Sequence, residues 1–223
     1  MQGSLFISKK GVFDNMTHNH DRESLLNAKQ LLALVLAALI LAAFVPGRCA
    51  SGETASDDGI PVITSVGKSN VKVNGVKSRG RLVKYTIPVQ LLQADPDFLA
   101  LMTEAEKYIG YPYVYGGSKP ETSFDCSGFV CWVYTQSGFF NTGRLGAKGL
   151  YSLCEDIPGD QARPGDLVFF EKTKGADSKG VTHVGIYVGN NMMLHAGDPI
   201  GFADLKSENW AKKLYGFGRL PKK

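Results

Sequence analysis

Hydrophobic positions along the 223-residue chain follow three patterns, and the first is a single unbroken run. Residues 31–45 read LLALVLAALILAAFV, with Lys29 just before the run and acidic residues soon after it. At about 1.5 Å per residue the run is short for a bilayer core of about 30 Å, and it matches the apolar region of a signal peptide. We therefore expect residues 1–30 to form a cytoplasmic or signal n-region and residues 31–50 a signal peptide or signal anchor. The remainder would be extracytoplasmic, either anchored in the membrane through residues 31–45 or released after cleavage.

The second pattern alternates apolar and polar residues over much of residues 60–94. Before it, residues 51–59 (SGETASDDG) are small, polar and acidic, as in a linker. Asn74-Gly75 separates two alternating runs and predicts a two-residue hairpin turn. Residues 60–94 carry six basic residues and no acidic one. These charges fit either a small module on an anionic polymer or membrane surface, or a solvated spacer whose lysines protect strand edges. We expect residues 51–94 to be a linker and a basic, β-rich segment.

The third pattern begins at Asp95 and predicts helices followed by strands. Asp95-Pro96 is typical of a helix start, and apolar residues then recur at helical spacing as far as Ile109. A second helix, apolar on nearly all sides and therefore buried, is expected over residues 126–136, and a short one over residues 147–153. Strands are expected at residues 167–171, 183–189, 192–196 and 214–220. This order predicts one domain over residues 95–223, with an α+β fold whose helices pack on an antiparallel sheet.

Charge and cysteine content exclude two classes of protein. The net charge is +4, but from residue 96 onward there are fourteen basic and fourteen acidic residues. A nucleic-acid-binding domain would present a basic stripe, so we expect no nucleic-acid partner. Four cysteines are too few for a disulfide framework. Cys131 and Cys154 are expected to be either small buried residues or, in an exported protein, a disulfide pair.

Cys126 has the position of a nucleophile. It lies in the motif FDCSGFV, between an acid and a serine, at the start of the predicted buried helix. Backbone N–H groups and the positive end of the helix dipole stabilise a thiolate there. A cysteine kept only for packing would more often lie inside the apolar run, as Cys131 does. Ser123 or Asp125 is the expected N-cap of this helix.

A thiol nucleophile needs a base, and we consider His183 and His195, because His18 and His20 precede the apolar run. The two bracket a hairpin sequence with a turn signal. A three-residue loop centred on Gly189 would place the two rings directly opposite each other on one face of the sheet. A two-residue loop would move His195 to the other face. One imidazole would take the thiol proton and the other would orient it.

Two other interpretations of the histidine pair stay open. Both rings could be satisfied by backbone groups inside a core hairpin and have no chemical role. Together with Cys126 they could also form a Cys-His-His zinc site, although no two of these three residues are closely spaced in the sequence. The hydrolase interpretation needs neither a metal nor a cofactor.

Five motifs, in order along the chain, resemble those of the NlpC/p60 family of cell-wall cysteine peptidases. They are YVYGG at 113–117, FDCSG at 124–128, PGDLVFF at 164–170, HVGIYVG at 183–189, and His195, within a match over roughly residues 96–221. The resemblance implies a papain-like α+β fold. It also implies hydrolysis of bacterial peptidoglycan stem peptides, typically at the γ-D-glutamyl bond to the diamino acid.

The resemblance also assigns roles to individual residues. It implies that Cys126 is the nucleophile, His183 the base and His195 the orienting third member of a triad. Tyr113 matches the family's tyrosine that lies near the oxyanion.

The residues that flank the nucleophile are implied to contact the substrate. In some members the acid and the serine at the positions of Asp125 and Ser127 help to recognise the free amine of the stem peptide, and a helix cap is the other role expected of Asp125. Residues 144–149 (RLGAKG) depart from the arginine-threonine-alanine pattern of many members. The finer substrate contacts therefore cannot be transferred from the family.

Competing functions follow from the same residues. The fold also suits another thiol acyl-transfer enzyme, such as a cell-wall amidase, and a non-catalytic wall-binding module. Relatives of this domain type often accompany conjugation machinery, which is a partner that the resemblance alone suggests.

Overall fold

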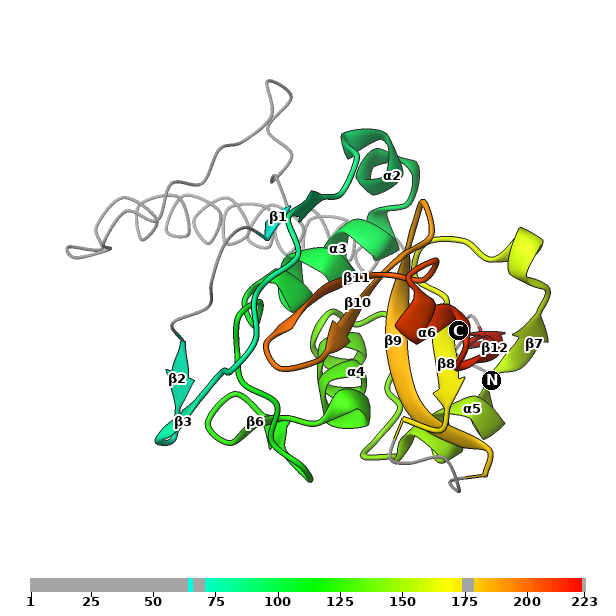
Figure 1. The fold of residues 1–223 in the computed structure, drawn as a ribbon. Coiled ribbons are helices and arrows are strands. Elements are labelled where there is room, and N and C mark those ends of the chain that lie inside the picture. The colour runs from blue at the N-terminus through cyan, green and yellow to red at the C-terminus, as the bar shows by residue number, and fades with distance from the viewer. Residues whose placement is uncertain (1–63, 66–70, 174–178, 222–223) are drawn as a thin grey trace, which may run out of the picture. The chain divides into compact units, whose positions relative to one another are not determined.

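The computed structural model describes residues 64–65, 71–173 and 179–221 (Figure 1). The predictions for residues 1–30, 31–50 and the acidic linker lie outside these ranges. Within the described ranges no helix is both long enough and apolar enough to cross a membrane. All described residues belong to one compact unit.

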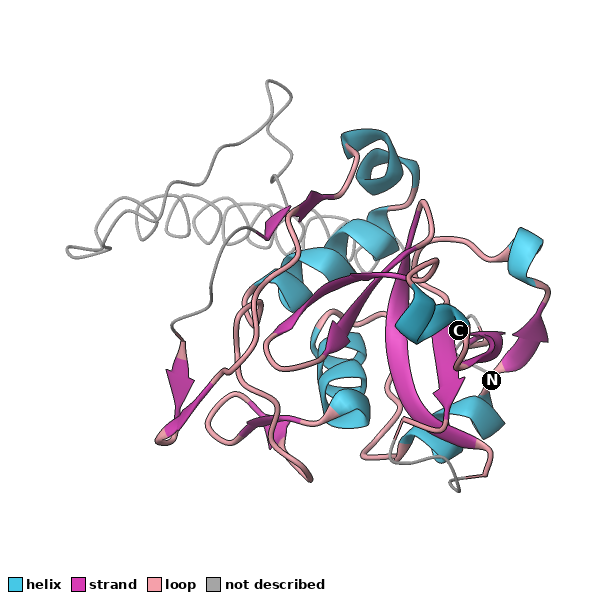
Figure 2. Ribbon diagram, in the orientation of Figure 1, coloured by secondary structure: helices cyan, strands magenta, loops and turns pink. Residues whose placement is uncertain are grey.

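An antiparallel sheet of six strands forms the centre of the fold (Figures 1 and 2). Its strands are β7 (Glu155–Ile157), β8 (Leu167–Glu171), β9 (Val181–Gly189), β10 (Met192–Ala196), β11 (Ile200–Asp204) and β12 (Leu214–Arg219). Their order in the sheet is β11-β10-β9-β8-β12-β7, so β8 to β11 form a meander and β12 pairs with the other side of β8. The four predicted strands are confirmed. Strands β7 and β11 were not predicted, because β7 is a short polar edge strand and β11 follows a turn without a hairpin signal.

Most of the helices precede this sheet along the chain, and the last one lies between β11 and β12. The helices are α2 (Val89–Ala94), α3 (Pro96–Glu106), α4 (Cys126–Gln136), α5 (Ala147–Leu153) and α6 (Glu208–Ala211), with a 3-10 turn η1 (Gly159–Gln161). The Asp95 carboxylate caps α3 by accepting the N–H groups of Asp97 and Phe98, as the sequence predicts. Helix α3 ends at Glu106, and turns then carry the chain to Gly110, which has a positive φ of 92°.

The main core lies between the sheet and α4. Helix α4 packs against β9 and β10, and α5 packs against β9. Phe129, Val130 and Val133 of α4 are fully buried, which explains why this helix is apolar on nearly all sides. A smaller second cluster contains Val168, Phe170, Met193, Ala203 and Leu205. These residues alternate along their strands with those of the main core, so they lie on the other face of the sheet.

The segment before α3 contributes short elements to the same unit. Strand β1 (Thr64–Ser65) pairs with β4 (Tyr85–Thr86), and β2 (Lys72–Val73) pairs with β3 (Val76–Lys77). The predicted hairpin turn at Asn74-Gly75 is confirmed, with φ of 44° and 81°. Helix α2 was not predicted. Ile87 and Leu92 of this segment are buried in the main core.

The turn between β9 and β10 differs from the expected three-residue loop. Met192 pairs with Gly189, so the loop consists of Asn190 and Asn191 alone. Both have positive φ, 53° and 58°, as a two-residue turn of this kind requires. Beyond the loop the register shifts at a bulge that leaves Val188 as the extra residue.

The prediction that His183 and His195 lie directly opposite each other is therefore wrong. The two-residue loop alone would place His195 on the other face of the sheet. The bulge at Val188 shifts the register by one more residue and returns both histidines to the same face. Continuing the register places His195 opposite Gly185, two positions from His183.

Candidate active site

The predicted nucleophile, Cys126, is the first residue of α4. Asp125 is the N-cap of this helix, because its Oδ1 accepts the Gly128 N–H at 2.7 Å. The other candidate cap, Ser123, instead donates its hydroxyl to the Pro112 carbonyl at 2.5 Å. Cys126 is only 5% exposed, and its place in the first turn lies in the positive field of the helix dipole.

A loop before the helix brings Tyr113 to this site. Tyr113 forms a bridge with Phe124, and the Val114 N–H donates to the Phe124 carbonyl at 2.9 Å. The tyrosine is thereby held next to the residues at the start of α4. Burial is the main cause that raises the pKa of Tyr113 above its ordinary value, and the negative charges of Cys126 and Asp125 raise it further. Tyr113 is therefore a protonated hydrogen-bond donor throughout the neutral pH range.

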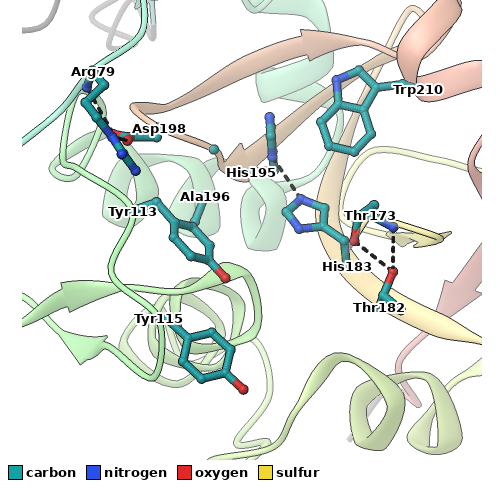
Figure 3. A pocket seen from close by; sticks show the side chains of 11 residues that line it. Arg79, Tyr113, Tyr115, Thr173, Thr182, His183, His195, Ala196, Asp198 and Trp210 are labelled. Atoms are coloured by element: carbon teal, nitrogen blue, oxygen red, sulfur yellow. Dashed lines mark hydrogen bonds and ion pairs between the residues drawn. The ribbon is translucent and has the colours of Figure 1, made fainter. Parts of the chain in front are cut away.

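The two histidines are joined by a hydrogen bond. Nε2 of His183 lies 2.9 Å from Nδ1 of His195, and both side chains are buried (Figure 3). Their diagonal contact needs the glycine at position 185. A Cβ at Gly185 would lie 3.2 Å from Cβ of His195 and 2.9 Å from Sδ of Met193. A larger residue there would push the His195 ring away from its partner.

Burial decides the charge of His195. It lowers the pKa of His195 to about 4, so this imidazole is neutral near pH 7. A neutral His195 can accept a hydrogen bond on Nδ1. When His183 donates that bond from Nε2, its Nδ1 becomes the basic nitrogen of the ring.

Trp210 of α6 covers both histidines, and the sequence did not single it out. Its ring lies 5.3 Å from that of His183, stacked at 27°, and 4.9 Å from that of His195, edge-on at 80°. Phe170 supports the indole from the sheet, with ring centroids 4.7 Å apart. These contacts limit the rotation of both imidazoles. No spacing in the sequence connects α6 with the hairpin, so only the folded structure shows this contact.

A cleft of about 470 Å³ opens beside the histidine pair (Figure 3). Its lining residues are Arg79, Tyr113, Tyr115, Thr173, Thr182, His183, His195, Ala196, Gly197, Asp198 and Trp210. The fold thus brings Tyr113, His183 and His195 together in one cleft. Cys126, Asp125 and Ser127 are buried and do not belong to its lining. Tyr113, which lines the cleft, lies near enough to Cys126 for a charge on the thiol to raise the pKa of the tyrosine.

Asp125 and Ser127 form a polar network with Arg144. Nη2 of Arg144 lies 2.8 Å from Oδ2 of Asp125, and its Nη1 donates to the Ser127 hydroxyl at 3.0 Å. The same Oδ2 accepts the Gly116 N–H at 3.0 Å. Both carboxylate oxygens of Asp125 therefore have partners within the protein. The helix cap is confirmed, and substrate recognition by Asp125 and Ser127 stays a prediction.

Two alternatives from the sequence are not supported by the geometry. Cys131 and Cys154 are free thiols rather than a disulfide pair. In the described part of the chain, no three His, Cys, Asp or Glu side chains are placed so that they could hold a metal ion, as the zinc interpretation of Cys126 and the histidines requires.

An α+β domain in which a helix begins with a cysteine and packs on a sheet that carries two hydrogen-bonded histidines has the architecture of a cysteine peptidase. The NlpC/P60 family matches residues 110–219 of the chain. Residues 110–219 form a domain of this family, which confirms the resemblance that the five motifs indicate.

Individual relatives agree with this membership. The chain is 43% identical over 134 residues to the bifunctional muramidase/DL-endopeptidase CwlT of Bacillus subtilis, covering 59% of this chain and 40% of the relative. It is 33% identical over 167 residues to the gamma-DL-glutamyl hydrolase of Bacillus subtilis, covering 73% of this chain and 39% of the relative. The chain thus spans about two fifths of the length of these curated relatives.

A solved structure confirms the α+β fold. It is the crystal structure of a protein of the NLP/P60 family from Staphylococcus aureus, described as similar to a lipoprotein. It is 44% identical to this chain and superposes with a TM-score of 0.55, covering 58% of this chain and 43% of that one.

Proposed function

We propose that this domain is a peptidoglycan hydrolase, a cysteine endopeptidase that cleaves stem peptides between γ-D-glutamate and the following diamino acid. The observation that carries the proposal is the 2.9 Å contact between Nε2 of His183 and Nδ1 of His195. A thiol nucleophile needs a base whose tautomer and orientation are held by a third group, and this pair meets that need. The names of the two curated relatives, a DL-endopeptidase and a gamma-DL-glutamyl hydrolase, support the choice of bond.

The proposed reaction begins at Cys126. Nδ1 of His183 takes the thiol proton, while its Nε2–H stays bonded to neutral His195. The thiolate attacks the amide carbonyl, and the imidazolium of His183 then protonates the leaving amine. Water, activated by the same histidine, releases the acyl group and restores the thiol. Every proton taken up by His183 is returned within one cycle.

The oxyanion of the tetrahedral intermediate is assigned to the Tyr113 hydroxyl and the backbone N–H of Cys126. The raised pKa of Tyr113 supports this role, because the hydroxyl keeps its proton while negative charge develops beside it. The first turn of α4 adds the positive end of the helix dipole. The substrate lies outside the cytoplasm, so an extracytoplasmic location belongs to the proposal. Anchoring through residues 31–45 and contact with conjugation machinery stay predictions.

The test uses the full chain with purified peptidoglycan, and released fragments are identified by mass spectrometry. Fragments ending in L-Ala-γ-D-Glu are expected, and they should disappear after thiol alkylation and persist with a chelator. Cys126→Ala should be inactive. Cys154→Ala is the matched control, because it removes a free thiol at the C-cap of α5 instead of the one at the start of α4, and it should keep full activity. Tyr113→Phe should lose activity by about 10²–10³-fold.

Other results would assign a different function. Release of whole stem peptides from the glycan would identify an amidase. Retention of the folded protein on insoluble wall without any product would indicate a wall-binding module. Substantial turnover by Cys126→Ala would overturn the cysteine mechanism itself.

A further inference from the structure

Arg79 reaches the cleft from outside the region that matches the NlpC/P60 family. It precedes residues 110–219, yet it lines the same cleft as Tyr113, His183 and His195. Figure 3 shows Arg79 and Asp198 at the side of the cleft that lies across His195 from His183. The basic segment therefore supplies a charged group to the cleft of the family domain.

Three hydrogen bonds hold Arg79 in this place. The N–H of Arg79 donates to Oδ1 of Asp198 at 3.2 Å, and its Nε donates to Oδ2 at 2.9 Å. The N–H of Gly80 donates to the Asp198 carbonyl at 3.0 Å. A Cβ at Gly80 would lie only 2.3 Å from that carbonyl oxygen, so this approach of two backbones requires glycine. Asp198 follows His195 in the connection between β10 and β11, which ties Arg79 to the hairpin of the histidines.

The guanidinium of Arg79 is held in position by Asp198 but remains exposed to solvent. Its side chain is 86% exposed, whereas that of Asp198 is 21% exposed. The contacts with Asp198 use the backbone N–H and Nε, which leaves the two terminal nitrogens of the fork on the solvent side. Among the described residues that line the cleft, Arg79 is the only arginine or lysine. A fixed arginine fork with exposed terminal nitrogens is suited to bind a carboxylate through two parallel hydrogen bonds.

We propose that Arg79 binds a free carboxylate of the substrate and so makes the cleft selective for acidic stem peptides over amidated ones. This inference rests on the proposed function for its substrate class. A γ-linked glutamate keeps its α-carboxyl group free, and a diamino acid such as diaminopimelate carries a further carboxylate, so the proposed substrate offers suitable groups. Asp198 has a positioning role in this proposal, because it orients the guanidinium through Nε.

The test compares defined stem peptides in pairs that differ in one group. One pair has a carboxylate or a carboxamide at the α-position of γ-D-glutamate. The other has diaminopimelate or lysine as the diamino acid. In the wild type, kcat/KM should be higher for the acidic member of at least one pair. Arg79→Gln should lower kcat/KM for that member by about 10- to 100-fold, a range typical of losing a hydrogen bond to a charged group, and by less than about threefold for its neutral partner.

Matched controls separate this effect from general loss of charge or fold. Arg81→Gln removes a neighbouring exposed arginine that does not line the cleft, and it should leave the selectivity unchanged. Arg79→Lys keeps the charge but not the fork, so it should retain part of the selectivity. An Arg79→Gln variant that lowers kcat/KM equally for both members of each pair, or for neither, would overturn the proposal.

Peptide binding can be measured in the Cys126→Ala variant, which should not cleave the peptides. The effect of Arg79 on affinity is then independent of turnover. Calorimetric affinities for the same peptides should show the same dependence on Arg79. Dependence on Arg79 without cleavage by the wild type would support the carboxylate site and reject the endopeptidase. Cleavage by the wild type, together with affinities that do not depend on Arg79, would support the endopeptidase and reject the carboxylate site. A protein that binds none of these peptides would reject the carboxylate site.

Discussion

His195 is a buried residue whose neutral ring would orient His183, the base of the proposed reaction. Its neutral Nδ1 accepts from His183, and its ring is enclosed by Trp210 and by the glycines at 185 and 197. A buried neutral imidazole accepts a hydrogen bond well, but its protonation costs free energy because the resulting charge is buried. The orienting role proposed for His195 and the expected pH dependence of stability therefore have the same physical cause, which is burial of the ring.

The lowered pKa of His195 predicts a loss of stability in acid. Below its ordinary pKa of 6.5, the unfolded chain takes up a proton that the folded protein does not bind until about pH 4. The free energy of unfolding should therefore be unaffected by this group above pH 6.5 and should fall by about 3 kcal/mol between pH 6.5 and pH 4. Urea unfolding of wild type and His195→Gln at several pH values measures this contribution. The stability difference between the two proteins should change by this amount over the window, and a difference that is independent of pH would contradict the assignment.

The roles proposed for the two histidines predict which substitution costs more activity. His195→Ala should lose less activity than His183→Ala, because water can partly replace an orienting acceptor but not the base. Steady-state rates on the same peptide, measured near pH 7, give the comparison. The opposite order would mean that the two histidines have exchanged roles.

At the scale of the secondary-structure element, the β9–β10 hairpin decides whether the histidines meet. Its two-residue turn alone would place His195 on the other face of the sheet from His183. The bulge at Val188 returns His195 to the same face. The result is a diagonal contact between the rings across a position that has no side chain. A direct pairing would have placed the two Cβ atoms side by side instead.

Gly185→Ala should therefore reduce activity strongly, although the substitution adds only one methyl group. The added methyl group would meet Sδ of Met193 and Cβ of His195, and overpacking of this kind costs about 1–3 kcal/mol. Because His195 has to move, kcat should fall by at least about tenfold. Gly216→Ala on β12 is the matched control, since a methyl group there meets nothing within 4 Å. Equal activity of the two variants would show that the diagonal contact does not depend on Gly185.

On the scale of the whole molecule, the segment before α3 is part of the packed unit. Ile87 and Leu92 are buried in the main core with residues of α3 and α4. Leu82 packs against Gly201 of β11, where an added Cβ would lie 2.8 Å from its Cδ2. The segment is thereby placed close enough to bring Arg79 to the cleft.

Leu92→Ala should destabilise the whole unit and not only α2. Removal of a fully buried leucine side chain typically costs 2–5 kcal/mol, so the urea midpoint should fall while a single transition is kept. Val83→Ala is the control, because Val83 is 46% exposed and its loss should change the free energy of unfolding by less than about 0.5 kcal/mol. A separate early transition for α2 would show that this segment unfolds independently.

The local features of the protein follow from its sequence alone. The helix starts at Asp95 and Cys126, the hairpin turn at Asn74-Gly75 and the four main strands follow from capping, turn chemistry and periodicity, which act between near neighbours. The same local rules single out Cys126 and the two histidines as candidates. They fail where an element lacks its own periodicity, as in α2 and β7.

How distant positions meet depends on the packing of the whole fold. The bulge that returns His195 to the face of His183, the Trp210 ring over both, and the contact of Arg79 with Asp198 each join residues whose proximity no local pattern encodes. Each depends on small shifts in register and on the packing of several elements at once. Such packing reflects the free energy of the whole folded unit, which no short stretch of sequence contains.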